Sequence, residues 1–401
     1  MKKLSLALLA CIFQMVSTHA QTSPADSTSY KQRKLKVEEV NLVSGYYNQD
    51  GNNSAVTGGI GTEKLTDFAN TLDVVLIQAD KKNRQYTWAA EIGIDHYTSA
   101  SSDKIDPHTI SSASSHDTRV YPSLAVSRND NKGNTLGVAA SYSHEFDYVS
   151  YGLGLNYIKT SKDNNRELSL HLQSYFDTWD VIYPIELRPP GGGFSGRGRN
   201  PRTYKPRDSY SATVSYSQII NKRLQVALLM DLIYQAGLLA SDYQRVYFTD
   251  HSERIENLPG TRFKLPLGVR VNYFAGDRFI FRMYYRYYQD DWGIKAHTAN
   301  IEMPVKLNAF ISISPFYRFY SQVATQYFAP YAMHNNGETF YTSDYDLSKF
   351  SSHFFGSGIR FAPENGVFKI KHWTVLELRY GHYIRSTGLH SDIISLNATF
   401  K

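Results

Sequence analysis

Hydrophobic and polar residues alternate with a period of two along most of this chain, from residue 36 to its end. In residues 149–157, the odd positions are Val, Tyr, Leu, Leu and Tyr, whereas the even positions are Ser, Gly, Gly and Asn. Similar alternation recurs in residues 167–176 and 265–273. A period of two places successive side chains on opposite faces of a β-strand. The pattern therefore predicts an all-β protein.

About sixteen segments show this pattern, and many have the 9–11 residues that a tilted strand needs to cross a bilayer. We therefore predict a transmembrane antiparallel up-and-down β-barrel of about sixteen strands over residues 36–401. The even number places both ends of the barrel on one side of the membrane. The predicted strands are 36–47, 69–80, 85–98, 118–129, 134–146, 148–160, 166–178, 208–220, 222–238, 264–275, 277–290, 294–305, 307–322, 351–363, 367–384 and 389–401.

The links between these segments alternate in length, which is a second indication of a membrane barrel. Every second link is short, and the long links are interleaved with the short ones. Short periplasmic turns and long extracellular loops are typical of bacterial outer-membrane barrels. The short links are 81–84, 129–133, 162–165, 221–222, 275–277 and 362–366, and the long links are 48–68, 99–117, 179–207, 239–263 and 323–350.

The last predicted strand has an aromatic residue one position from the end of the chain. Its apolar positions Ile394, Leu396, Ala398 and Phe400 alternate with polar ones. Outer-membrane barrels commonly end in such a strand, so the barrel-assembly machinery is an expected partner through Phe400. The alternative interpretation of this segment is the last strand of an ordinary soluble sheet.

The first twenty residues predict a signal peptide. Lys2 and Lys3 precede a short apolar run, and Thr18 and Ala20 are the small residues that a signal peptidase requires. A lipoprotein signal ending at Cys11 is the alternative. Residues 21–35 are predicted to be a short periplasmic lead-in. The compartment that these features indicate is the outer membrane of a Gram-negative bacterium.

Composition narrows the possible classes of protein. The chain has 31 Tyr and 21 Phe, an aromatic-rich composition that is expected if aromatic girdles mark two membrane interfaces. Cys11 is the only cysteine and lies in the predicted signal peptide, so disulfides, thiolate nucleophiles and Cys-ligated metals are excluded from the mature chain. Loss of Lys2 and Lys3 reduces the formal charge from +6 to +4, and no dense basic block accompanies it. We therefore expect no nucleic-acid partner, and we expect no cofactor.

Arginines on neighbouring predicted strands form the strongest candidate site. Arg282 and Arg286 share the polar face of one strand, Arg270 lies on the polar face of the strand before, and Arg318 lies on that of 307–322. If these faces line the lumen, their guanidinium groups favour anionic solutes. The alternative is internal ion pairing with carboxylates on suitable faces. The candidate lumen-lining residues are Arg270, Arg282, Arg286, Arg318, Glu91, Asp95, Asp231, Glu377 and Arg379.

The long loops suggest three further possibilities. Residues 189–202 are rich in Gly and Arg, and they could contact anionic lipopolysaccharide, fold into the pore or remain a solvated loop. Four aspartates at 290, 291, 344 and 346 could supply oxygen ligands to calcium, although their spacing matches no complete calcium loop. A Ser/His pair at the barrel rim would suit an outer-membrane lipid hydrolase. The residues available for such a pair are His372, His382, His390, Ser386 and Ser391.

Known enzyme motifs are absent from the sequence. It contains no His-Glu-x-x-His zinc motif, no phosphate-binding glycine loop and no Gly-x-Ser-x-Gly elbow. We therefore predict that the protein is not an enzyme.

Residues 284–298, with the sequence Tyr-Tyr-Arg-Tyr-Tyr-Gln-Asp-Asp-Trp-Gly-Ile-Lys-Ala-His-Thr, resemble a known family. It is an uncharacterised bacterial family, a domain of unknown function whose members are predicted outer-membrane β-barrels. Supporting segments are 231–246, 315–322 and 341–347, and the resemblance extends over nearly the whole mature chain. The resemblance implies a barrel fold and assigns no catalytic residue.

The leading functional hypothesis is a passive channel or substrate-specific porin for small, anionic solutes, because barrels of this strand number leave an aqueous lumen. The alternative is a structural or ligand-binding barrel whose lumen is plugged. Outer-membrane lipid and lipopolysaccharide are the expected surroundings. The sequence leaves the oligomeric state open.

Overall fold

The computed structural model describes residues 34–98, 105, 116–130, 132–187 and 204–401. The predicted signal peptide 1–20, most of the lead-in and the loop 189–202 lie outside these described residues. In the described ranges, no helix combines the length and the apolar character that a bilayer crossing requires.

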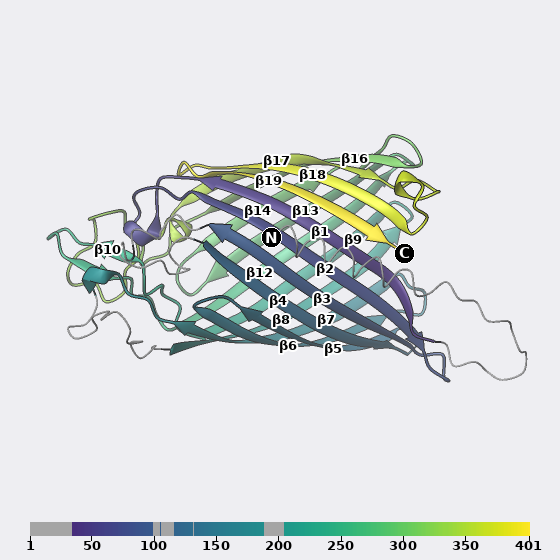
Figure 1. Cartoon of the computed structure of the whole chain (residues 1–401), viewed down its shortest axis with the longest axis horizontal. Coiled ribbons are helices and arrows are strands. Elements are labelled where there is room, and N and C mark those ends of the chain that lie inside the picture. Colours follow the sequence, from purple (N-terminus) through teal and green to yellow (C-terminus); the bar gives the residue numbers. More distant parts are fainter. Residues whose placement is uncertain (1–33, 99–104, 106–115, 131, 188–203) are drawn as a thin grey trace, which may run out of the picture. The chain divides into compact units, whose positions relative to one another are not determined.

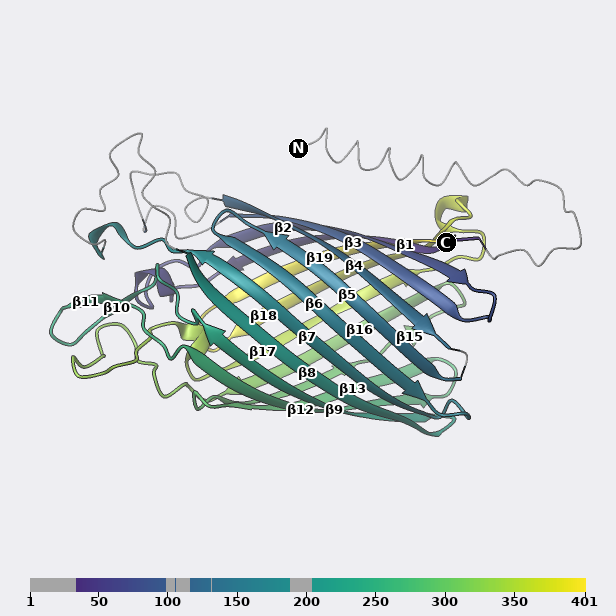
Figure 2. The ribbon, with the colours of Figure 1, turned by 90° about the horizontal axis from the view of Figure 1, so that it is seen from below.

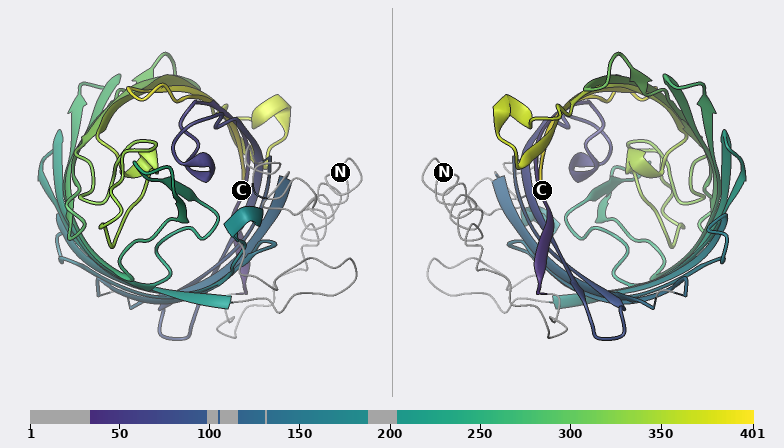
Figure 3. Two further views of the ribbon diagram at one scale, coloured as in Figure 1. Left: turned by 90° about the vertical axis from the view of Figure 1, so that its left-hand side faces the viewer. Right: turned by 90° about the vertical axis from the view of Figure 1, so that its right-hand side faces the viewer.

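A single antiparallel sheet closes into a barrel (Figures 1 and 3), because each strand pairs with the next and β19 pairs with β1. The sheet has 17 segments, but β14 and β15 both pair between β13 and β16 and form one interrupted strand, which leaves sixteen. The barrel segments are β1 (Lys36–Asp50), β2 (Leu65–Ala79), β3 (Gln85–Thr98), β4 (His116–Asn129), β5 (Asn134–His144), β6 (Tyr148–Thr160), β7 (Arg166–Asp180), β8 (Tyr204–Asn221), β9 (Leu224–Gly237), β12 (Thr261–Ala275), β13 (Phe279–Asp290), β14 (Lys295–Glu302), β15 (Val305–Lys306), β16 (Ile311–Gln322), β17 (Phe350–Phe361), β18 (Trp373–Arg385) and β19 (His390–Phe400).

Each of the sixteen predicted segments overlaps one strand of the ring, so the predicted fold class is confirmed. The largest boundary difference is at β18, which begins at Trp373 and not at residue 367. The turn η4 (Val367–Lys369) occupies the intervening chain, with Val367 buried and with positive φ angles at Phe368 and Lys369 that a strand does not allow.

The barrel has an apolar outer face and a polar inner face. In β6, the side chains of Tyr151, Leu153 and Leu155 are more than half exposed, whereas Gly152 and Gly154 between them are buried. In β19, Ile394 and Leu396 are also exposed, so this strand is not the edge of an ordinary soluble sheet. Exposed apolar bands of this size fit the hydrocarbon of a bilayer and not water.

The links between strands divide between the two ends of the barrel (Figure 2). One end carries 80–84, 130–133, 161–165, 222–223, 276–278, 307–310 and 362–372. Among the described residues, the other end carries 51–64, 145–147, 181–187, 238–260, 291–294, 323–349 and 386–389.

Three links at the second end, 51–64, 238–260 and 323–349, pack together as a loop cap. Viewed along the barrel, these links lie within the outline of the ring (Figure 3). The centre of the cap is the buried cluster of Val246, Phe248 and Tyr341, in which the two aromatic rings meet edge to face with centroids 4.9 Å apart. The hairpin of β10 (Arg245–Tyr247) and β11 (Glu253–Ile255) lies within this cap and was not predicted.

Side-chain hydrogen bonds hold the cap together and fasten it to the wall. Arg245 Nη1 donates to the carbonyl of Val56 at 2.9 Å, which joins two of the links. Thr342 Oγ1 donates to Glu256 Oε1 at 2.5 Å, which joins the link 323–349 to the link 238–260. Arg385 of β18 forms an ion pair with Asp346 of the cap at 2.6 Å.

Candidate functional site in the barrel lumen

Strand register places the predicted arginines on the inner face of the barrel. Directly opposed residues in a sheet share a face. Arg270 on β12, Tyr284 on β13, Asn300 on β14, Arg318 on β16 and Phe354 on β17 form one continuous row of opposed positions. We call the inner face of β12 to β18 the arginine wall. It is defined by Arg270, Arg282, Arg286, Arg318 and Arg379.

Two of these arginines form ion pairs inside the lumen. Arg379 Nη2 lies 3.1 Å from Glu302 Oε1, and Arg379 Nη1 lies 3.1 Å from Glu377 Oε1. Arg282 Nη1 lies 3.7 Å from the other oxygen of Glu302. Glu302 was not among the predicted lumen-lining residues. It lies on the polar face of the predicted strand 294–305, so its charge and its position could have identified it.

The predicted carboxylates pair less than expected with the predicted arginines. Among the described residues, Glu377 alone of the four pairs with one of these arginines. Asp95 Oδ1 accepts a hydrogen bond from the Tyr121 hydroxyl at 2.9 Å. Glu91 and Asp231 lie opposite Ser123 and Thr213, and they form no ion pair in the described part of the chain.

Arg270, Arg286 and Arg318 have no carboxylate within ion-pair distance among the described residues. Each guanidinium lies near an aromatic ring instead, at 6.0 Å from the centroid of Tyr284, 5.9 Å from Tyr288 and 5.6 Å from Phe354. The ring faces attract the cations without neutralising them. The arginine wall therefore retains three positive charges that can attract anions.

Two small cavities adjoin these charges. One, of about 190 Å³, is lined by Arg318 and Arg379 together with Asn300, Phe316 and Phe354. The other, of about 330 Å³, lies where Arg385 and Asp346 connect the wall to the loop cap. Only the second reaches the volume of about 300 Å³ at which small-molecule pockets typically begin.

The inner face of β3 to β9 has a different composition, and we call it the serine wall. It carries a recess of about 580 Å³, the largest cavity described here in the lumen. Small hydroxyl side chains dominate its lining. These are Ser123, Ser141, Ser143, Ser150, Ser209 and Ser211.

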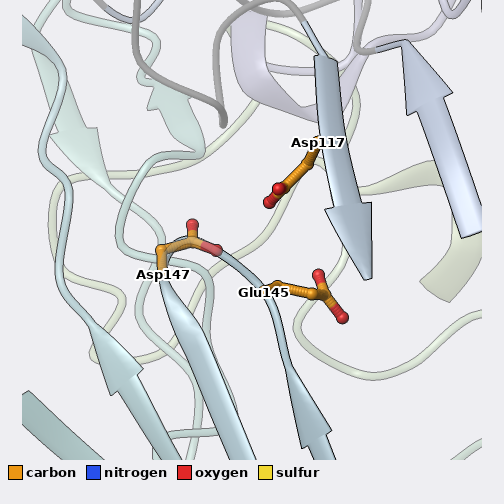
Figure 4. A group of neighbouring side chains, drawn as sticks. All are labelled: Asp117, Glu145 and Asp147. Atoms are coloured by element: carbon orange, nitrogen blue, oxygen red, sulfur yellow. The ribbon is translucent and has the colours of Figure 1, made fainter. Parts of the chain in front are cut away.

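An acidic cluster, which was not predicted, lies near the serine wall. Carboxylate oxygens of Asp117, Glu145 and Asp147, from β4 and the link between β5 and β6, lie within 4.8 Å of one another (Figure 4). Glu145 pairs with Arg119 at 3.4 Å and accepts a hydrogen bond from Tyr97 at 2.7 Å. Burial raises the pKa of Asp147 to about 6. Protein partners therefore satisfy Glu145 in this cluster.

The four aspartates considered for calcium are occupied by protein partners. Asp290 binds Arg262, with Nε at 3.0 Å, and accepts hydrogen bonds from the backbone of Trp292 and Ile294. Asp291 Oδ2 accepts a backbone hydrogen bond from β12. Asp346 pairs with Arg385, and Asp344 Oδ1 accepts the backbone N–H of Asp346.

The serines and histidines of the last hairpin are not brought together. His382 Nδ1 lies 2.8 Å from Asp392 Oδ1, and Ser391 points to the opposite face because it is the next residue along β19. Ser386 Oγ accepts the N–H of Ser351. His372 Nδ1 lies 2.9 Å from the Lys401 carbonyl, and His390 pairs across the strands with Ile384. In the described structure, no Ser–His hydrogen bond joins these residues.

A closed sixteen-strand barrel with an apolar outer face and a charged inner face defines a transmembrane β-barrel of the outer-membrane class. Residues 5–367 match the family described as protein of unknown function (DUF3570), and the chain belongs to that family. No curated protein matches the chain in sequence.

Several solved outer-membrane proteins match the chain at low sequence identity and with TM-scores below 0.5. Pseudomonas aeruginosa OccK1 (OpdK) is 7% identical with a TM-score of 0.43, covering 91% of this chain and 98% of its own. Pseudomonas aeruginosa OccD3 (OpdP) is 8% identical with a TM-score of 0.45, covering 96% and 97%. A BenF-like porin from Pseudomonas fluorescens Pf-5 is 8% identical with a TM-score of 0.42, covering 90% and 98%. Similarities at this level carry no inference about a solute.

Proposed function

We propose that this protein is an outer-membrane channel for small solutes, with a preference for anions along the arginine wall. The observation that carries the proposal is the set of three inner-face arginines, Arg270, Arg286 and Arg318, that lack a carboxylate partner among the described residues. A barrel of sixteen strands is wide enough to leave an aqueous lumen. Unneutralised charges on a low-dielectric wall raise the local concentration of counter-ions.

Planar-bilayer conductance of the folded protein tests this proposal. Discrete openings are expected, and the reversal potential across a KCl gradient should indicate anion preference. Replacement of Arg270, Arg286 and Arg318 by Gln should reduce that preference. Arg223→Gln, in the short link between β8 and β9, is the matched control and should leave it unchanged. Persistent silence from protein that is verified to be folded would exclude a constitutively open channel.

A second candidate is a non-conducting barrel closed by the loop cap. The observation that favours it is the packing of three links around Val246, Phe248 and Tyr341, with Arg385 fastening the cap to the wall. Arg385→Gln removes that connection. If the parent protein is silent and this variant conducts, the cap closes the lumen. If the parent protein already conducts, the closed barrel is excluded.

Targeting to the outer membrane is part of the proposal. In β19, Phe400 pairs with Val40 at the seam that closes the barrel and stacks on Trp373 with a centroid distance of 5.6 Å. Recognition of this strand by the assembly machinery predicts that Phe400→Ala lowers the amount of assembled barrel. Tyr151→Ala, on the outer face of β6, is the control. Equal amounts of both variants would contradict a specific role for Phe400.

A further inference from the structure

The recess in the serine wall has no part in the proposed anion path, and its chemistry is different. It extends across the inner faces of β3 to β9 and has a volume of about 580 Å³. Ligand pockets for small molecules typically measure about 300–1,000 Å³. The recess is therefore large enough for a solute of one or two sugar rings.

Two tyrosine rings of the recess lie close to glycine backbone. A Cβ atom on Gly152 would lie 2.8 Å from the Tyr175 ring, and one on Gly93 would lie 2.0 Å from the Tyr121 ring. The rings therefore lie directly over backbone that has no side chain. The Arg119 guanidinium lies over the Tyr121 ring, 4.9 Å from its centroid, so Tyr175, which is 41% exposed, is the ring that offers a face to the lumen. Such a face can pack against the C–H groups of a saturated ring.

A row of opposed positions that includes three serines passes through Tyr175. Ser123, Ser141, Gly152, Tyr175 and Ser209 occupy consecutive opposed positions on β4 to β8. Ser143 accepts a hydrogen bond from Arg119, and Ser209 accepts one from Gln235. Within the described chain, the hydroxyls of Ser123, Ser141 and Ser211 form no hydrogen bond with protein. A hydroxyl both donates and accepts, which suits a ligand that does the same.

The charges of the recess are largely compensated by one another. Arg207 binds Asp177 at 2.7 Å, and Asp177 is 4% exposed with its Oδ1 atom lacking a donor. Arg119 is held by Glu145 and Ser143. Glu91, at the edge of the recess, has no cationic partner among the described residues. These features disfavour an anion and supply acceptors for ligand hydroxyls.

We propose that this recess binds a neutral polyhydroxylated solute, a mono- or disaccharide, with a ring packed on Tyr175 and hydroxyls bonded to Ser123, Ser141 and Ser211. The site goes beyond the proposed anion preference and does not depend on it. Binding at the inner wall requires only that the solute enters the lumen from one end.

Equilibrium binding by calorimetry tests the site on the folded full-length barrel in a detergent without a sugar headgroup. The probes are glucose and maltose, with gluconate as the anionic comparison. Saturable binding of a neutral sugar is expected. Tyr175→Ala should weaken it about two- to tenfold, as loss of one aromatic contact predicts. The control is Tyr151→Ala, on the outer face of the neighbouring strand, which should have no effect.

Filling the recess provides an independent variant. Ser211→Trp should abolish sugar binding, whereas Ser217→Trp, on the same face of β8 but outside the recess lining, should preserve it. Absence of saturable binding for both neutral sugars would overturn the proposal, as would binding unaffected by Ser211→Trp. Binding of gluconate alone would also overturn it. None of these outcomes depends on conductance, so the anion-channel proposal is tested separately.

Discussion

The two walls of this lumen share one backbone geometry and differ in the side chains that it carries. On the arginine wall, long guanidinium groups and aromatic rings project inward, and three of the cations lack carboxylate partners among the described residues. On the serine wall, small hydroxyl residues and glycines open a recess in which Arg207 is paired with Asp177. Because alternate positions face the lumen in both, a barrel can present two chemically distinct surfaces without any change of fold.

Strand order places these surfaces across the lumen from each other. In the ring of sixteen, β3 and β13 are eight steps apart in either direction, which is half of the circumference. Glu91 lies six residues from the first residue of β3, and Arg286 lies seven from the first residue of β13. Both strands begin at the same end, so the two charges are at similar heights. We therefore expect a transverse difference in potential across the lumen.

The largest effect should follow from removing the unpaired cations. Replacing Arg270, Arg286 and Arg318 together by Gln leaves Glu91, Asp95 and Asp231 unbalanced on the other wall. Anion preference should then fall several-fold and give way to cation preference, because the sign of the lumen charge sets selectivity. Reversal potential in a KCl gradient measures this, and the effect should weaken at high salt. An unchanged potential would show that the arginine wall does not contact the ion path.

The loop cap should respond to pH through Glu256, which is buried with no cation beside it among the described residues. Burial, with the nearby charge of Asp344, raises the pKa of Glu256 to about 8. An acid whose pKa is raised on folding contributes stability that is fully present below its unfolded pKa, here about 4.5, and lost as pH rises to about 8. The cap should therefore loosen between these values.

Hydrogen exchange of the Val246 and Phe248 amides measures this loosening. Glu256→Gln should preserve most of the protection factor at pH 8–9, measured relative to the base-catalysed intrinsic rate, because the amide stays neutral. Glu338→Gln is the matched control in the same cap, where the hydrogen bond with His334 helps to lower the pKa of the carboxyl. Acceleration of equal size in both variants would assign the pH response to other groups.

The alternation of residues predicted all sixteen strands because it depends only on which side chains face lipid and which face water. The same pattern placed the charged residues on strand faces. It did not reveal that Glu302 pairs with Arg282 and Arg379, because pairing depends on register between strands that adjoin only in the folded ring. The cap core and the Gly152–Tyr175 contact were missed for a similar reason, since they join residues distant in sequence or on different strands.

Substitution of Glu302 should change the charge of the arginine wall by a smaller amount than the triple arginine variant. Glu302→Gln releases Arg282 and Arg379 from their shared carboxylate and increases the positive charge of the arginine wall. Anion preference should rise, in the direction opposite to that of the triple arginine variant. The free energy of unfolding should fall by about 1 kcal/mol or less, because Arg282 is 53% exposed and water screens its pair. Reduced anion preference in this variant would contradict the proposed role of the wall.

The smallest expected effect comes from a substitution at Gly152, which alters only the serine wall. A Cβ added at Gly152 would meet Ser141 Oγ at 2.1 Å and the Tyr175 ring at 2.8 Å, and would displace both side chains. Gly152→Ala should therefore weaken sugar binding about twofold or more, as a shifted aromatic contact predicts, and leave ion selectivity unchanged. Gly154→Ala is the matched control on the same strand and face, because its new Cβ would meet the flexible end of Gln173. If both variants bind sugar equally well, the ring of Tyr175 is not the surface on which the solute packs. If Gly152→Ala alters selectivity as well, the two walls do not act as separate surfaces.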